Sequence, residues 1–203
     1  MSPFGVVLRL RNNMADLTIA VLAGTTREQR KSIHAAKLVA EVGATFEDIE
    51  IIFVDPKDFH FAGDGNDPEG KDPKYTAITE KADAFFIVTP EYNHSFPGSL
   101  KRMLDSEGKN YIHKPVAFAG VSSGQWGGIR AIEQLIGSVR EMGLISTFTD
   151  MQFPKIQELF DDNGVLQNEA YREYVKGAWV ELIWMAKTLK WGRENLTNKY
   201  HQI

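Results

Sequence analysis

Residues 84–98, with the sequence AFFIVTPEYNHSFPG, are the stretch from which the fold follows most directly. The run of five apolar residues at 84–88 predicts a strand buried inside a sheet. A polar loop follows, and Pro97 suits the first turn of a helix over 99–105, where a proline sacrifices no hydrogen bond. Because α/β sheets bind small ligands at the loops that follow their strands, residues 90–98 predict a binding loop.

Apolar runs alternate with helical periodicities along the rest of the chain. We expect strands over residues 17–23, 49–54, 83–88, 115–119 and 144–149. We expect helices over residues 32–42, 74–81, 128–142 and 168–190. Near-continuous apolar strands between helices are typical of a parallel sheet that is buried on both faces. The predicted fold class is therefore α/β, with a flavodoxin-like, doubly wound, five-stranded parallel sheet and helices on both faces.

Length and composition limit the classes of function. The 203 residues suit one domain, which we place at 17–203 after an N-terminal extension at 1–16. Met14 is an alternative start, and a weak organelle-targeting segment is the other interpretation of the extension. The net charge of -4 gives no support to binding of nucleic acid or of an anionic membrane. The chain has no cysteine and no apolar run near the ~18 residues that span a bilayer, so we expect a cytoplasmic protein.

The loop between the first strand and the first helix has the composition of an anion site. Its sequence is Gly24-Thr25-Thr26-Arg27-Glu28-Gln29-Arg30-Lys31-Ser32. Backbone N–H groups at a helix start bind phosphate, the hydroxyls add donors, and Arg27, Arg30 or Lys31 supplies positive charge. The alternative is a solvated basic helix start with Ser32 as N-cap. Cations at a helix start are unfavourable without an anion, which favours the phosphate site.

The glycine-rich loop at 120–128, GVSSGQWGG, follows the fourth strand and has two interpretations. Its four glycines let the backbone approach a flat ring closely. Its first five residues also match the Gly-x-Ser-x-Gly elbow of serine hydrolases, with Ser122 as nucleophile. That chemistry requires an acid and a downstream histidine, and His201 is the only histidine that follows. The five histidines show no metal-ligand spacing, so we expect no metal site.

These loops together resemble the NAD(P)H-dependent FMN reductase family, which includes quinone, azo-dye and chromate reductases. The most specific motif, Pro-Glu-Tyr-Asn-x-Ser-x-Pro-Gly-x-Leu-Lys, is matched without a miss at residues 90–101. The phosphate loop of the family, Gly-Ser-x-Arg, appears as Gly24-Thr25-Thr26-Arg27, and the glycine-rich loop appears at 122–128. The resemblance covers residues 17–189.

The resemblance implies that the first loop holds the phosphate of FMN and that residues 90–93 and 122–126 line the isoalloxazine ring. Many relatives carry an aromatic residue where this chain has Ser123, so that contact either passes to Trp126 or is lost. Such relatives usually form dimers or tetramers. The residues expected to bind the cofactor are Gly24, Thr25, Thr26, Arg27, Arg30, Ser32, Pro90, Glu91, Tyr92, Asn93, Ser122, Ser123, Gly124, Gln125 and Trp126.

The expected function is FMN-dependent transfer of hydride from NADPH or NADH to a quinone, flavin or similar acceptor. Because the flavin carries the chemistry, we assign no catalytic side chain. Backbone N–H groups near 91–93 and 123–126 are expected to stabilise the reduced ring, and Arg27 or Arg30 is expected to meet the phosphates of the nicotinamide cofactor. A flavodoxin-type electron carrier is the alternative, although such carriers are usually strongly acidic and lack arginines in this loop.

Overall fold

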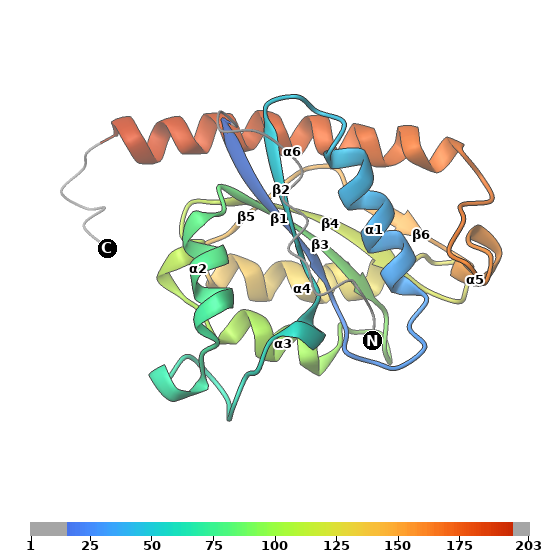
Figure 1. The fold of residues 1–203 in the computed structure, drawn as a ribbon, viewed down its shortest axis with the longest axis horizontal. Coiled ribbons are helices and arrows are strands. Elements are labelled where there is room, and N and C mark those ends of the chain that lie inside the picture. Colours follow the sequence, from blue (N-terminus) through green and yellow to red (C-terminus); the bar gives the residue numbers. More distant parts are fainter. Residues whose placement is uncertain (1–15, 197–203) are drawn as a thin grey trace.

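The computed structural model describes residues 16–196 and contains one parallel sheet with the strand order β2-β1-β3-β4-β5 and with β6 beside β4 (Figure 1). The strands are β1 (Leu17–Ala23), β2 (Ile49–Val54), β3 (Ala84–Pro90), β4 (Pro115–Val121), β5 (Ile145–Ser146) and β6 (Met151–Phe153). The helices are α1 (Ser32–Gly43), α2 (Pro73–Lys81), α3 (Gly98–Asp105), α4 (Ile129–Glu141), α5 (Ile156–Leu159) and α6 (Ala170–Asn195). The predicted doubly wound parallel sheet is confirmed. The expected extension at 1–16 lies outside the described residues except for Asp16.

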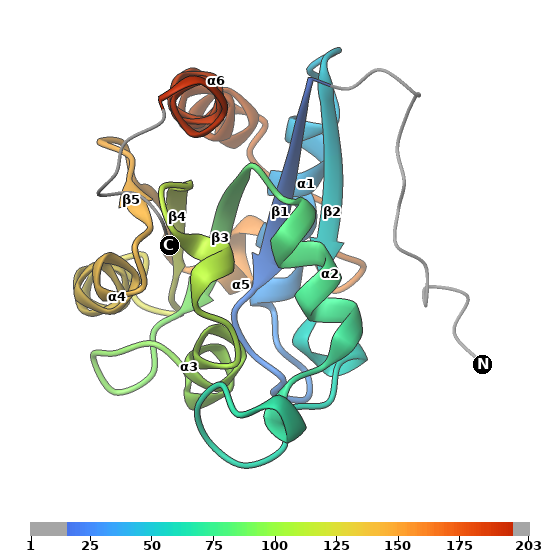
Figure 2. The same ribbon diagram turned by 90° about the vertical axis from the view of Figure 1, so that its left-hand side faces the viewer.

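Two hydrophobic clusters cover the two faces of the sheet. Successive residues of a strand point to opposite faces, so Val21 joins the cluster under α1 and α6 whereas Leu22 joins the cluster under α2, α3 and α4. Figure 2 views α6 and α4 nearly end-on, with β4 and β5 between them. In the first cluster Trp179 is fully buried, and its indole N–H donates to the carbonyl oxygen of Val39 at 2.9 Å. The side-chain alternation of the strands thus explains why helices cover both faces.

The prediction of a single fifth strand over 144–149 is wrong. That position in the sheet is held by two short strands, β5 and β6, which both pair with β4. Four residues (147–150) separate them where β4 has only two, so the strand is interrupted. Phe148 is 93% exposed there, and burial together with the nearby Glu133 raises the pKa of Asp150 to about 6. The interruption turns Phe148 outward, and β6 then resumes beside the carboxyl end of β4.

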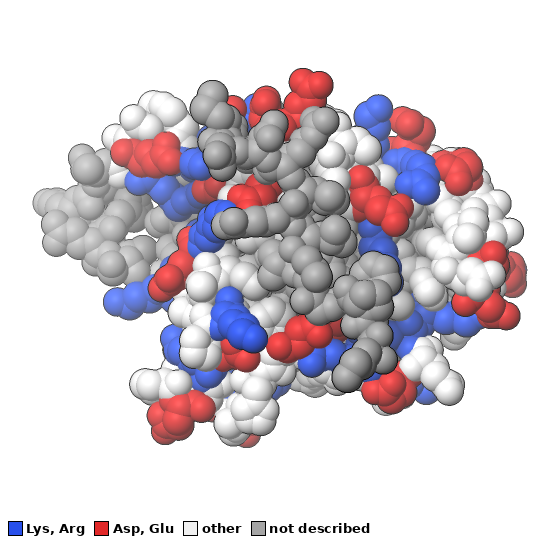
Figure 3. Space-filling model, viewed as in Figure 1, with Lys and Arg blue, Asp and Glu red and all other residues white. Residues whose placement is uncertain are grey.

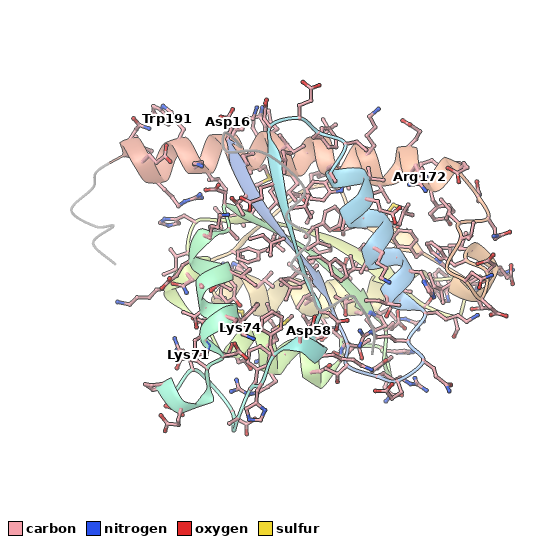
Figure 4. All side chains as sticks on the ribbon, viewed as in Figure 1. Asp16, Asp58, Lys71, Lys74, Arg172 and Trp191 are labelled. Carbon is pink, nitrogen blue, oxygen red and sulfur yellow. The ribbon has the colours of Figure 1, made fainter. Side chains whose placement is uncertain are left out.

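The amino ends of the strands are tied to α6, which extends five residues beyond the predicted end at Lys190. Lys190 and Arg193 each contact the carboxylate of Asp83 at 3.0 Å, and the backbone N–H of Thr18 donates to it at 3.1 Å. Figure 4 labels Asp16 at this upper end and Asp58 at the lower end, where the carboxyl ends of β1 and β2 lie. The lower end is therefore free of this ionic cluster and carries the loops considered next.

Close backbone packing brings the start of α4 against β4. A methyl group added at Gly120 would lie 2.6 Å from the carbonyl oxygen of Gly127 and 2.7 Å from that of Gly128. Real Cβ atoms do not approach backbone so closely. Gly128 has a φ of 82°, which L side chains rarely adopt. Packing therefore requires glycine at positions 120, 127 and 128 of this loop, independently of any ligand.

We expect Gly120→Ala to lower the free energy of unfolding by ~1–3 kcal/mol or more, because the clash involves backbone that cannot move aside. Gly137→Ala is the matched control. It lies within α4 with no atom within 4 Å of its added methyl group, and it should gain ~0.5–1 kcal/mol from helix propensity. Urea unfolding of both variants measures the difference. Equal effects of the two substitutions would contradict the packing argument.

Candidate functional site

The three loops singled out by the sequence meet at the carboxyl edge of the sheet. The hydroxyl groups of Thr25 and Tyr92 share a hydrogen bond of 3.2 Å, which joins the first loop to the loop after β3. The backbone N–H of Glu91 donates to the carbonyl oxygen of Val121 at 2.9 Å, which joins that loop to the glycine-rich loop. The backbone N–H of Ser122 in turn donates to Phe153 of β6 at 3.1 Å. The expected convergence is therefore present.

The first loop leaves backbone donors at the start of α1. Thr25 is only 2% exposed, and its Oγ1 accepts a hydrogen bond from the N–H of Arg27 at 3.2 Å. Ser32 is the first helical residue and not the N-cap, which is Lys31 and makes no side-chain capping bond. Within the described residues, the N–H groups of Thr26 and Ser32 donate to no protein atom. These two groups can therefore meet an anion.

The cations of the first loop differ in what they contact. Arg30 forms an ion pair with Asp55 after β2, while its Nε and Nη1 are buried without a hydrogen-bond partner. Lys31 lies 3.3 Å from Asp162. Arg27 forms no ion pair in the described part of the chain, and its guanidinium lies 5.7 Å from the ring centroid of Tyr92. Among the described residues, Arg27 is therefore the arginine of this loop without a carboxylate partner, which suits it to meet a phosphate.

Two carboxylates, those of Asp55 and Asp58, lie near the guanidinium of Arg30. Burial first, and the neighbouring Asp55 second, raise the pKa of Asp58, while Arg30 and Lys74 act in the opposite direction. Figure 4 labels both Asp58 and Lys74 at the lower end of the molecule. Arg30 is thus already surrounded by negative charge, which makes it a weaker phosphate ligand than the sequence alone suggested.

The loop after β3 is a tight turn. Tyr92 and Ser95 exchange backbone hydrogen bonds of 2.8 and 3.0 Å, and the two residues between them have positive φ, 51° at Asn93 and 65° at His94. This is the geometry of a type I′ turn, for which asparagine is well suited. The N–H groups of Glu91 and Tyr92 are both used by protein acceptors, so only that of Asn93 is left for a ligand. The expected row of donors at 91–93 is therefore reduced to one.

The glycine-rich loop is exposed at its centre, over residues 123–126. Trp126 is 59% exposed, and a methyl group added at Gly124 would meet nothing within 4 Å. Ser123 and Gln125 are exposed as well, whereas Ser122 donates its hydroxyl to the carbonyl oxygen of Gly124 at 2.9 Å. No histidine within residues 16–196 contacts that hydroxyl, and His201 lies outside them. The described chain therefore shows no activated serine.

Sequence reasoning missed Arg130, in the first turn of α4. Its Nε lies 2.9 Å from a carboxylate oxygen of Glu91, and its Nη1 lies 2.8 Å from Nε2 of His94. A cation at the start of a helix opposes the helix dipole, and the same signal drew attention to the first loop. The signal could have found Arg130, but only the fold shows which residues it contacts.

The residues at this edge fit FMN. A phosphate suits the unpaired N–H groups of Thr26 and Ser32 together with the unpaired guanidinium of Arg27. A flat ring suits the open backbone around Gly124 and the exposed indole of Trp126.

No group of three or more potential metal ligands occurs in the described part of the chain. No helix among residues 16–196 is both long and apolar enough to cross a bilayer.

Comparison with known proteins gives consistent matches. The sequence profile of the family described as NADPH-dependent FMN reductase matches residues 17–155. A quinone reductase of Pseudomonas putida is 26% identical over 186 residues, which cover 81% of this chain and 95% of that protein. The flavoenzyme NAD(P)H:(acceptor) oxidoreductase FerB of Paracoccus denitrificans shares the fold, with a TM-score of 0.68 at 21% identity over 85% of this chain and 98% of that one. A short-chain flavodoxin associated with a bacterial microcompartment also shares the fold. Its TM-score is 0.57 at 14% identity, and the match covers 84% of this chain and 99% of that one.

The match to the family profile and to the quinone reductase defines a class, the flavin-dependent oxidoreductases, and the solved structures show that the sheet is flavodoxin-like. Within that class, the chain belongs to the NADPH-dependent FMN reductase family. The predicted family, the enzyme class and the pairing of FMN with NAD(P)H are confirmed. The interpretations as an electron carrier and as a serine hydrolase are thereby set aside.

We expect Arg27→Ala to weaken FMN binding roughly 10- to 150-fold, because it removes a charge-assisted contact worth about 1.5–3 kcal/mol. Riboflavin lacks the phosphate and should bind the variant as it binds the unmodified protein. Calorimetric titration of the apoprotein with each flavin measures both affinities. Equal losses for FMN and riboflavin would move Arg27 out of the phosphate site.

Proposed function

We propose that this chain takes hydride from NADPH or NADH and delivers two electrons to a quinone or similar small acceptor, with FMN held at the carboxyl edge of the sheet. The observation that carries this proposal is the meeting of the first loop and the loop after β3, through Thr25 and Tyr92, beside the unpaired cation Arg27. The quinone as acceptor is supported by the name of the relative in Pseudomonas putida.

In this proposal the residues of the protein bind and orient FMN. When bound, FMN supplies the hydride and electron chemistry, so no side chain need act as nucleophile or general base. Thr26, Ser32 and Arg27 hold the phosphate through N–H groups and positive charge. The N–H groups of Asn93 and of the exposed residues at 123–125 have no protein acceptor among the described residues and would stabilise negative charge on a bound ring. The exposed indole of Trp126 would pack on the ring and limit the access of water.

The remaining residues of the expected site have supporting roles in this proposal. Gly24 packs so closely on β3 that an added methyl group would lie 2.8 Å from the carbonyl oxygen of Val88. Pro90 ends β3, and Glu91 and Ser122 bond to neighbouring backbone and side chains. Arg30 is held by Asp55 and shapes the loop instead of binding the phosphate. The loops therefore separate into residues that meet FMN and residues that hold those in place.

We also propose a homodimer or homotetramer in the cytoplasm that has neither nucleic-acid nor membrane partners. The exposed apolar residues of α6 support self-association, because Val180, Trp184 and Trp191 are 56%, 66% and 58% exposed. Blue and red side chains intermingle over the face shown in Figure 3, and the net charge is -4, as expected for a protein that does not bind nucleic acid.

We expect the purified protein to be yellow and to release one FMN per subunit on denaturation, because the site accommodates a single phosphate. With NADPH or NADH and a benzoquinone, the nucleotide absorbance at 340 nm should fall in step with quinone reduction. Absorption spectra and a coupled turnover assay test both statements. A colourless protein that fails to take up added FMN at micromolar concentration would refute the proposal.

We expect Ser122→Ala to retain quinone reduction, because the Ser122 hydroxyl only donates within its own loop. The variant should show at most a modest loss of FMN affinity, corresponding to one neutral hydrogen bond of ~0.5–1.5 kcal/mol. Hydrolysis of a p-nitrophenyl ester is assayed in parallel. Ester turnover in the flavin-free protein that disappears in the variant would favour the hydrolase instead.

A further inference from the structure

The turn that presents Tyr92 and Asn93 needs external support. Both of its central residues, Asn93 and His94, hold positive φ values without being glycine, a conformation that costs energy. Two backbone hydrogen bonds between Tyr92 and Ser95 close the turn, and both lie within the turn itself. The bond from the Glu91 N–H to Val121 and the shared hydrogen bond of the Thr25 and Tyr92 hydroxyls hold the start of the turn. The tip at Asn93 and His94 needs a further contact from another element.

Arg130 supplies that contact from α4. Its guanidinium reaches the loop at two places, Oε1 of Glu91 at 2.9 Å and Nε2 of His94 at 2.8 Å. These residues flank Tyr92 and Asn93 in the sequence. The Glu91 side chain is 8% exposed, and neither its Oε2 nor Nε of Arg130 has a hydrogen-bond partner among the described residues. The contact of Arg130 with Glu91 is therefore an ion pair that compensates this buried carboxylate by its charge.

We propose, on the basis of the function proposed above, that Arg130 is a positioning residue that clamps the loop 91–94 and so orients the residues that meet the flavin ring. It acts through Glu91 and His94 and not by touching the phosphate, which is assigned to Arg27. Because α4 begins directly after the glycine-rich loop, the clamp also fixes the loop after β3 relative to that loop.

The contact with His94 sets a requirement for protonation. A guanidinium can only donate hydrogen bonds, so Nε2 of His94 must accept, which only the neutral imidazole can do. A protonated imidazole would face Arg130 as a second cation. The charged groups around the turn are Glu91 on the same loop, Arg130 on α4 and Arg27 on the first loop.

The first test needs no flavin. Hydrogen exchange of the peptide that covers residues 91–97 should be faster in Arg130→Met than in the unmodified apoprotein, and intermediate in Arg130→Lys, which keeps the charge. Arg140→Met is the matched control, because Arg140 is exposed on the same helix and its side chain forms no ion pair or hydrogen bond with the described residues. Unchanged exchange of this peptide in Arg130→Met overturns the proposal, whatever FMN does.

The second test measures affinity. Arg130→Met should weaken binding of FMN and of riboflavin by the same factor, roughly 5- to 50-fold after allowance for the partial exposure of the contact. Arg140→Met should stay within about twofold. A loss confined to FMN would make Arg130 a direct phosphate ligand and would overturn the positioning role. Failure of the unmodified protein to bind FMN would instead refute the proposed function, and the exchange experiment would still decide on the clamp.

Two further variants separate positioning from folding. Glu91→Gln added to Arg130→Met removes the uncompensated buried charge, so the melting temperature should recover while flavin affinity stays weak. His94→Gln keeps a neutral acceptor. Flavin affinity in His94→Gln should therefore stay closer to that of the unmodified protein than it does in Arg130→Met. Recovery of affinity together with stability, or a loss of affinity in His94→Gln as large as in Arg130→Met, would contradict the clamp.

Discussion

The loops of the site depend on backbone hydrogen bonds that continue the sheet beyond its strands. Gly24 donates to Val88 at 2.8 Å, Glu91 to Val121 at 2.9 Å and Ser122 to Phe153 at 3.1 Å, so each loop is bonded to the next strand along the edge. These bonds use atoms that every residue except proline possesses, and side chains therefore remain available for ligands. The ionic cluster around Asp83 secures the opposite edge, which leaves the loop edge without competing salt bridges from α6.

At the loop edge, the positive charge that stays unbalanced depends on which cations form ion pairs with carboxylates. Arg30 is paired with Asp55, Lys57 lies 2.6 Å from Glu28, and Arg130 is paired with Glu91. Arg27 remains, stacked over Tyr92. Two arginines three residues apart thus differ in role, because only one of them faces the acidic end of β2. A flavin phosphate would supply the counter-ion that the described chain does not give Arg27.

The strands and most helices could be predicted because their signals are local. Apolar runs marked β1 to β4, and Pro97 and Gly143 marked helix ends. The split of the fifth strand could not be predicted, because it depends on the register of residues 145–153 against β4 and not on their own composition. For the site, motif spacing brought the three loops together correctly. The pairing of Arg30 with Asp55 and the two contacts of Arg130 span 25 to 39 positions, and only folding creates them.

The split of the fifth strand has a consequence for the protein at high concentration. An uninterrupted strand at the margin of a sheet offers a row of unpaired N–H and C=O groups, onto which a strand from another molecule can add. Here the outermost position is broken between Ser146 and Met151 into pieces of two and three residues. A foreign strand would find no straight template of useful length. The division of this strand into β5 and β6, which was not predicted from the sequence, therefore protects this margin of the sheet against aggregation.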